Sequence, residues 1–101
     1  MEDHTEGELA VDVFQTPTSV VVQTAIAGVT REDIHISLHH NELKISGHRT
    51  PPTQVPHEQY VWRECFWGNF SRTIMLPSEV DATHIQATLV HGVLTITLPK
   101  K

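Results

Sequence analysis

Apolar residues recur at every second position along most of this chain, and a period of two predicts β-strands rather than helices. The clearest case is residues 34–39, where aliphatic side chains alternate with His35, Ser37 and His39. Eight short segments have this character: residues 9–14, 20–26, 34–39, 43–47, 58–64, 69–76, 83–90 and 93–98. The chain is therefore expected to be all-β.

Turn residues separate these segments. His40-Asn41 fits a tight reversal between two alternating segments. Residues 48–57 contain three prolines, so no continuous ladder can run through them and a long loop is expected there. About eight short strands in roughly 100 residues are typical of an immunoglobulin-like β-sandwich.

A length of 101 residues fits a single domain. We expect residues 1–8 to form a flexible acidic N-terminus and residues 9–101 to form the folded domain. A chain of this size buries one modest core and leaves no room for a deep enclosed active site. Function is therefore expected on surfaces, edges or grooves.

Charge and composition exclude several classes of partner. The chain has 12 acidic and 7 basic residues and a net charge of -5 with histidine neutral, which repels phosphate backbones and argues against nucleic acid. No run approaches the roughly 18 apolar residues that span a membrane. The single cysteine, Cys65, cannot form an internal disulfide, so the cytoplasm is the simplest location.

The last third of the chain carries the most specific motifs. Residues 70–77 read Phe-Ser-Arg-Thr-Ile-Met-Leu-Pro, and residues 92–100, which follow Ala87, read Gly-Val-Leu-Thr-Ile-Thr-Leu-Pro-Lys. This pattern resembles the α-crystallin domain of small heat shock proteins (the Hsp20 family), of the bacterial and plant type. The resemblance spans about residues 9–100. It departs from the family at Ala27, where proline is usual, and at Cys65, where arginine is usual.

The resemblance implies an ATP-independent chaperone that holds unfolding polypeptides and prevents their aggregation. It implies no enzymatic activity and no cofactor. In the family, a groove between two strands accepts an Ile-x-Ile-type segment, and the corresponding residues here are 34–39 and 85–90. The side chains that would line this groove are Ile34, Ile36, Leu38, Ile85, Ala87 and Leu89.

The resemblance also implies a homodimer formed by strand exchange. In bacterial and plant members, the long loop carries an extra strand that pairs with the partner's first strand; here residues 58–62 would dock on residues 9–14. The contact would involve Val11, Val13, Tyr60, Val61, Trp62, Glu64 and Arg72. The expected partners are thus a second copy, unfolded clients and Ile-x-Ile-type segments.

Family members usually add a long N-terminal arm and a C-terminal tail that carries the Ile-x-Ile segment. This chain has about eight residues before its first predicted strand and stops at Lys101. We therefore expect a dimer rather than a large assembly, in either a trimmed form or a natural minimal member.

Several polar residues admit a functional and a structural interpretation. The histidines could bind a metal or sense pH, but no ligand spacing supports a metal site, and exposed strand and turn positions are the default. They are His4, His35, His39, His40, His48, His57, His84 and His91. Cys65 could act as a nucleophile, but no catalytic motif accompanies it, and an ordinary position near the dimer contact is favoured.

Arg72 is expected to pair with a carboxylate, either Glu64 or Asp12. Trp62 and Trp67 are expected to pack in an interface or the core rather than to bind clients. One alternative function stays open: a co-chaperone domain of similar fold that docks on a larger chaperone without holding unfolded clients. The Phe-x-Arg and Gly-Val-Leu motifs favour the heat shock family.

Overall fold

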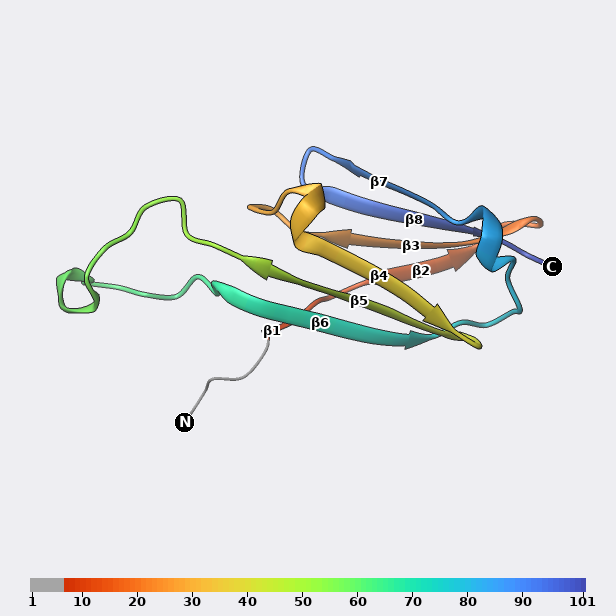
Figure 1. Cartoon of the computed structure of the whole chain (residues 1–101), viewed down its shortest axis with the longest axis horizontal. Helices are drawn as coiled ribbons and strands as arrows, with labels where there is room; N and C mark the ends of the chain where they lie inside the picture. The colour runs from red at the N-terminus through yellow and green to blue at the C-terminus, as the bar shows by residue number, and fades with distance from the viewer. Residues whose placement is uncertain (1–6) are drawn as a thin grey trace.

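The alternating segments pair into two β-sheets that lie face to face (Figure 1). The computed structural model describes residues 7–101. The first sheet contains, in spatial order, β1 (Gly7–Glu8), β6 (Gly68–Met75), β5 (Glu42–Arg49) and β4 (Ile34–His39). The second contains β2 (Asp12–Gln15), β3 (Ser19–Ala25), β8 (Val93–Pro99) and β7 (Gln86–Val90). The predicted all-β sandwich is confirmed; β1 has only two residues and pairs parallel to β6, whereas the other strand pairs are antiparallel.

The core lies between the sheets because the pleat of each strand turns alternate side chains inward. Val22 of β3 lies opposite Ile96 of β8, and both are fully buried. Ile45 of β5 and Phe70 of β6 fill the facing sheet. Apart from Val21, the buried apolar side chains of the described residues form one cluster: Leu9, Val20, Val22, Ile26, Leu43, Ile45, Phe70, Ile74, Leu76, Val80, Leu94, Ile96 and Leu98.

Tight turns join the strands of two hairpins, β4–β5 and β7–β8. The β4–β5 turn places His40 at φ 57°, and the β7–β8 turn places His91 at φ 53° and Gly92 at φ 76°. Histidine is among the non-glycine residues enriched in this left-handed region. His40 and His91 therefore adopt the left-handed backbone conformation that the turns of their hairpins require.

The predicted strand at residues 9–14 is wrong in its bounds, because the chain changes sheets within it. β1 belongs to the first sheet and β2 to the second. At the crossing, Leu9 is buried in the core, Arg72 Nη1 donates to the Leu9 carbonyl at 2.6 Å, and Thr24 Oγ1 donates to the Ala10 carbonyl at 2.8 Å. Residues 7–8, expected to be flexible, form β1, and residues 1–6 lie outside the described residues.

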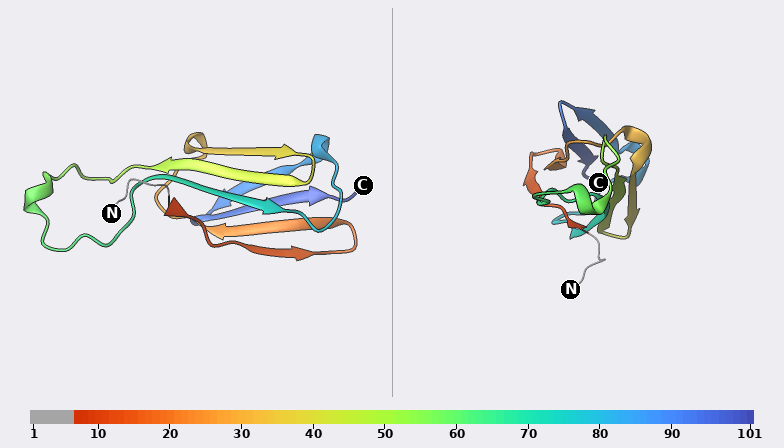
Figure 2. Two further views of the ribbon diagram at one scale, coloured as in Figure 1. Left: turned by 90° about the horizontal axis from the view of Figure 1, so that it is seen from below. Right: turned by 90° about the vertical axis from the view of Figure 1, so that its left-hand side faces the viewer.

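The strand predicted at residues 58–64 does not form in the single chain. The segment contains part of a short 3₁₀ helix, η2 (His57–Gln59), followed by irregular backbone. The loop between β5 and β6 extends beyond the end of the sandwich, away from every strand with which it could pair (Figures 1 and 2). A strand needs a ladder partner for its backbone groups, and this chain offers none at that place.

Candidate functional site

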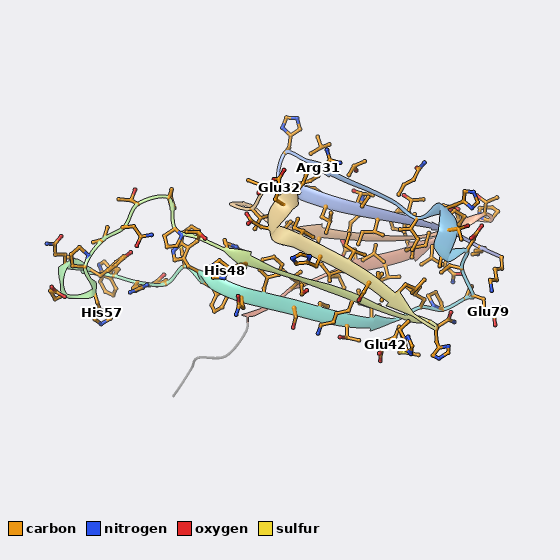
Figure 3. The ribbon with its side chains drawn as sticks, in the orientation of Figure 1. Arg31, Glu32, Glu42, His48, His57 and Glu79 are labelled. Atoms are coloured by element: carbon orange, nitrogen blue, oxygen red, sulfur yellow. The ribbon has the colours of Figure 1, made fainter. Side chains whose placement is uncertain are left out.

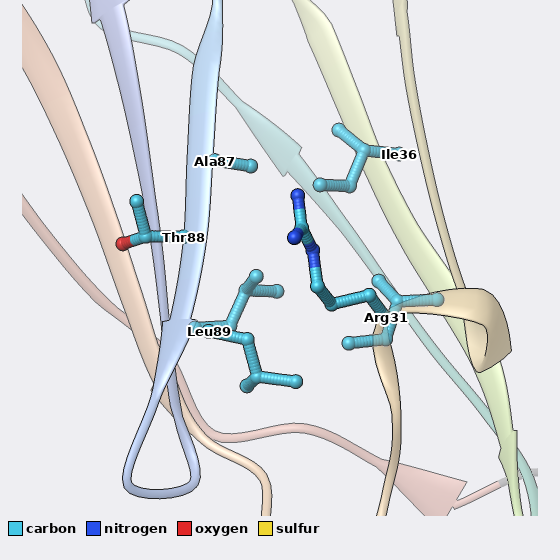
Figure 4. Close-up of a pocket in the computed structure, with 7 residues that line it drawn as sticks. Arg31, Ile36, Ala87, Thr88 and Leu89 are labelled. Carbon is cyan, nitrogen blue, oxygen red and sulfur yellow. The ribbon is translucent and has the colours of Figure 1, made fainter.

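An apolar groove lies between the strands that end the two sheets on one side of the sandwich. β4 is the last strand of the first sheet and β7 the last strand of the second. Side chains from both line a cavity of about 120 Å³, whose wall consists of Arg31, Ile34, Ile36, Ala87, Thr88, Leu89 and Leu94 (Figure 4). Because each edge strand has a sheet neighbour on one side only, its backbone groups on the other side can pair with another extended chain.

The pairing register turns the groove side chains inward. Ile36 lies opposite Ile45 of β5, and Leu89 lies opposite Leu94 of β8. Paired residues of an antiparallel ladder project to the same face, so Ile36 and Leu89 share the inner face with their buried partners. Among residues 7–101 no further strand covers them at the edge, and both stay half-buried. Ala87 is exposed, and the guanidinium of Arg31 lies between its small side chain and Ile36 (Figure 4).

Short 3₁₀ helices set the start of both groove strands. η1 (Arg31–Asp33) precedes β4, and the Asp33 carboxylate accepts from the N–H and the hydroxyl of Thr30 at 3.2 and 3.0 Å. Gly47 of β5 lets η1 lie close, because a Cβ there would overlap the backbone oxygen of Asp33. η3 (Ala82–His84) precedes β7, so the strand predicted from residue 83 begins only at Gln86.

Asp81 caps η3, and the pKa of its carboxyl is displaced. The hydroxyl of Thr83 donates to its Oδ1 at 2.6 Å and the backbone N–H of Thr83 at 2.9 Å, while His84 Nδ1 lies 2.7 Å from Oδ2. These hydrogen bonds, the Thr83 hydroxyl first, lower the pKa of Asp81 from 3.8 to about 2. The ionised carboxylate therefore holds the turn that leads into β7.

The structure brings together four of the six predicted groove residues. Ile34, Ile36, Ala87 and Leu89 line the cavity. Leu38 and Ile85 are absent from its wall and pack, half-buried, against the core.

Three cavity residues were not predicted: Arg31, Thr88 and Leu94. Leu94 could have been found from the hairpin, since it pairs with Leu89. Arg31 carries no sequence signal for this role, because it looks like one more polar residue of a connecting segment.

A second open edge lies at the opposite side of the same sandwich. β2 ends the second sheet, and its Val13 and Phe14 are 40% and 46% exposed. Val11, just before β2, packs against the core. The β5–β6 loop carries the most exposed large apolar side chains in the described chain, with Val61 at 87% and Trp62 at 80%.

The structure keeps the predicted dimer residues of the loop apart from those of β2. Tyr60 is half-buried beneath Arg63, whose guanidinium carbon lies 4.5 Å from the ring centroid. Trp62 and Glu64 line a shallow hollow with Cys65. In the single chain this loop projects away from the sandwich, so Tyr60, Val61, Trp62 and Glu64 do not reach β2 (Figure 2).

The expected carboxylate partner of Arg72 needs correction, and one of the two settings expected for Trp62, the core, is excluded. Arg72 makes its hydrogen bond to the Leu9 carbonyl rather than to Glu64 or Asp12, because it faces inward on β6 where the chain crosses between the sheets. Trp62 packs in no core, since it is 80% exposed on the loop. Trp67 is half-buried.

Residues 7–101 contain no group of three or more His, Cys, Asp and Glu side chains placed to hold a metal ion, and His4 lies outside them. His48 Nδ1 lies 2.8 Å from Asn69 Oδ1, and His57 Nδ1 lies 3.2 Å from Arg63 Nη1. Cys65 is a free, exposed thiol. No helix in the described part of the chain is long and apolar enough to cross a membrane.

Known proteins of one family are similar to this sequence over nearly its whole length. The model of the Hsp20/alpha crystallin family matches residues 12–101. Small heat shock protein C4 of Rickettsia felis is 33% identical over 90 residues, covering 89% of this chain and 55% of that protein. Heat shock protein 16 of Schizosaccharomyces pombe is 36% identical over 98 residues, covering 93% of this chain and 68% of that protein.

The fold is also similar to that of solved structures of small heat shock proteins. The solved structure of heat shock protein 16.0 from Schizosaccharomyces pombe superimposes with a TM-score of 0.84 at 34% identity, covering 94% of this chain and 88% of that one. The chain spans little more than half the length of the Rickettsia relative. Its sequence and its sandwich nevertheless match the family from β2 to the last residue, and the chain belongs to the Hsp20/α-crystallin family of small heat shock proteins.

Proposed function

We propose that this chain is the core of an ATP-independent holdase, a chaperone that binds unfolding polypeptides and prevents their aggregation. The observation that carries the proposal is the groove between β4 and β7, where an apolar cavity lies beside two strand edges that have no outer neighbour in the described part of the chain. An unfolding polypeptide exposes both kinds of group that such a groove can bind: aliphatic side chains and unpaired backbone.

The physical basis of holding is strand addition. An extended segment gains backbone hydrogen bonds along an edge, and its alternate side chains enter the cavity. Each aliphatic side chain that leaves water gains roughly 1.5–3 kcal/mol. The matching segment is of the Ile-x-Ile type, because residues two apart on a strand point to the same face. No chemical step is required, in line with a family of chaperones rather than enzymes.

We further propose that two copies dimerise by strand exchange. Residues 58–62 of one copy would become a strand only when they pair with β2 of the other. The exposure of Val61 and Trp62, and of Val13 and Phe14 on β2, supports this pairing, since dimerisation would remove both apolar sets from water. The free thiol of Cys65 is compatible with a reducing cytoplasm, where we place the protein.

The decisive experiment heats an aggregation-prone model enzyme with and without this protein, in the absence of ATP, and follows light scattering. A holdase lowers the scattering in proportion to its concentration. Direct binding of a fluorescent Ile-x-Ile peptide, measured by anisotropy, gives a readout that does not depend on holding strength. Unchanged scattering together with absent peptide binding would overturn the proposal, and capture of a large chaperone in the same buffer would favour the co-chaperone alternative.

A further inference from the structure

Arg31 is the one charged residue among the seven that line the groove cavity. It comes from η1, immediately before β4, and its guanidinium reaches into the space between Ala87 of β7 and Ile36 of β4 (Figure 4). The remaining lining is aliphatic apart from Thr88. A peptide that fills the cavity therefore meets a cation on an otherwise apolar wall.

The short helix η1 separates its charges between two surfaces. Glu32 and Asp33, which follow Arg31, line a different hollow together with His35 and His48. The Asp33 carboxylate is held there by its hydrogen bonds to Thr30. Figure 3 shows Arg31 and Glu32 at η1, beside the start of β4. No carboxylate of the described residues lines the groove cavity, and the positive charge of Arg31 is left for an incoming group.

We propose that Arg31 makes the groove selective for Ile-x-Ile-type segments that carry an acidic side chain in phase with the two isoleucines. The inference rests on the proposed function of the groove and adds the chemical class of its occupant. A carboxylate beside a guanidinium gains a charge-assisted hydrogen bond, and the planar guanidinium can hold it in bidentate fashion.

Strand geometry determines which positions of the peptide share a face with the two isoleucines. Side chains of an extended segment alternate between faces, so residues that share the isoleucine face also point into the groove. Ile34 and Leu89 lie at the end of the cavity next to η1, whereas Leu38 and Ile85 lie outside its wall at the other end. An acidic residue two positions from an isoleucine therefore points into the groove toward the guanidinium of Arg31, which lies between Ala87 and Ile36, and one at a neighbouring position points to solvent.

The net charge of -5 does not oppose this selection at close range. At physiological ionic strength the Debye length is about 8 Å, so charges elsewhere on the surface are largely screened, whereas a contact pair in the groove is screened less. The selectivity should therefore weaken as salt is raised.

The test uses three peptides with the core Ile-Ser-Ile, extended two positions away on both sides by Glu, Gln or Lys. Affinities are measured by anisotropy for the unmodified protein, for Arg31→Gln, for the charge reversal Arg31→Glu, and for Lys44→Gln. Lys44 is an exposed cation on β5, outside the groove, and its substitution removes the same charge elsewhere.

We expect the Glu peptide to bind about three- to tenfold more tightly than the Gln peptide. This preference should disappear in Arg31→Gln, turn toward the Lys peptide in Arg31→Glu, persist in Lys44→Gln, and shrink in 0.5 M NaCl. Equal binding of the Glu and Gln peptides, or a preference that survives in Arg31→Gln, would overturn the inference while leaving the groove intact. A Gln peptide that binds more tightly to Arg31→Gln would instead show that Arg31 only plugs the cavity. If none of the peptides binds any variant, the proposed function itself fails.

Discussion

Replacing Ala87 with tryptophan is the most direct perturbation of the groove. Ala87 lies on edge strand β7, its side chain is exposed, and it borders the cavity of about 120 Å³ opposite Ile36. An indole at this position would occupy the space that an incoming aliphatic side chain needs. Because the site is open to solvent, the larger side chain need not disturb the core.

The magnitude follows from the anchor that is lost. Burial of one aliphatic side chain gains roughly 1.5–3 kcal/mol, so its exclusion should weaken peptide binding by about ten- to a hundredfold. The free energy of unfolding should change by no more than about 0.5 kcal/mol, as for most surface substitutions. Peptide anisotropy measures the first quantity, and urea unfolding followed by circular dichroism measures the second.

Thr73→Trp provides the matched control. Thr73 is exposed on β6 and pairs with Lys44 on the outer face of the first sheet, away from the groove. It should bind the peptide as the unmodified protein does. If Ala87→Trp unfolds normally and binds the peptide within twofold of the unmodified protein, the assignment of the groove is refuted.

Three further predictions concern the core, the loop and the η3 cap. Gly47→Ala should destabilise the fold by about 1–3 kcal/mol in urea unfolding, since the new Cβ would lie 2.6 Å from Cζ of Phe70 as well as against backbone. Trp62→Ser should shift the proposed dimer toward monomer in sedimentation equilibrium while leaving the single-chain fold unchanged, because this side chain is 80% exposed in one copy. The Asp81 carboxyl should titrate near pH 2 by NMR; because its pKa is lowered from 3.8 on folding, the stability it contributes is present above pH 3.8 and is lost as the pH falls toward 2.

Each of these has a contrary result. A Gly47→Ala variant as stable as the unmodified protein would show that Phe70 and η1 can move away from the added Cβ at little cost in free energy. A Trp62→Ser variant that dimerises with unchanged affinity would place the dimer contact elsewhere. An Asp81 midpoint near 3.8 would mean that the hydrogen bonds from Thr83 do not persist in solution.

The fold was predictable wherever one strand face is buried. On β4 and β8, alternation alone identifies the strands and their inner faces, because a pleated strand exposes its two faces to different surroundings. The same rule located most of the groove. Ile34, Ile36, Ala87 and Leu89 follow from the alternation of two strands and from the family resemblance that places those strands together.

The remaining features depend on contacts that a one-dimensional pattern does not contain. The crossing near Leu9 depends on hydrogen bonds from Arg72 and Thr24, which come from distant strands. The side of η1 on which Arg31 emerges depends on how η1 lies against β5, where Gly47 permits the close approach of Asp33. Residues 58–64 have strand-like composition, but a strand also needs a partner, and a single chain provides none there.

The positions of the two open edges bear on how the proposed holdase would work as a dimer. β2 and β7 lie at opposite ends of the sheet β2-β3-β8-β7, three strand spacings or about 14 Å apart. A partner that pairs with β2 therefore leaves the groove beside β7 free, and dimerisation and peptide holding need not compete. A dimer would then present two grooves to one unfolding polypeptide. Once the first segment is bound, the second binds at the high effective concentration set by the connecting chain, so even weak grooves would hold a client firmly.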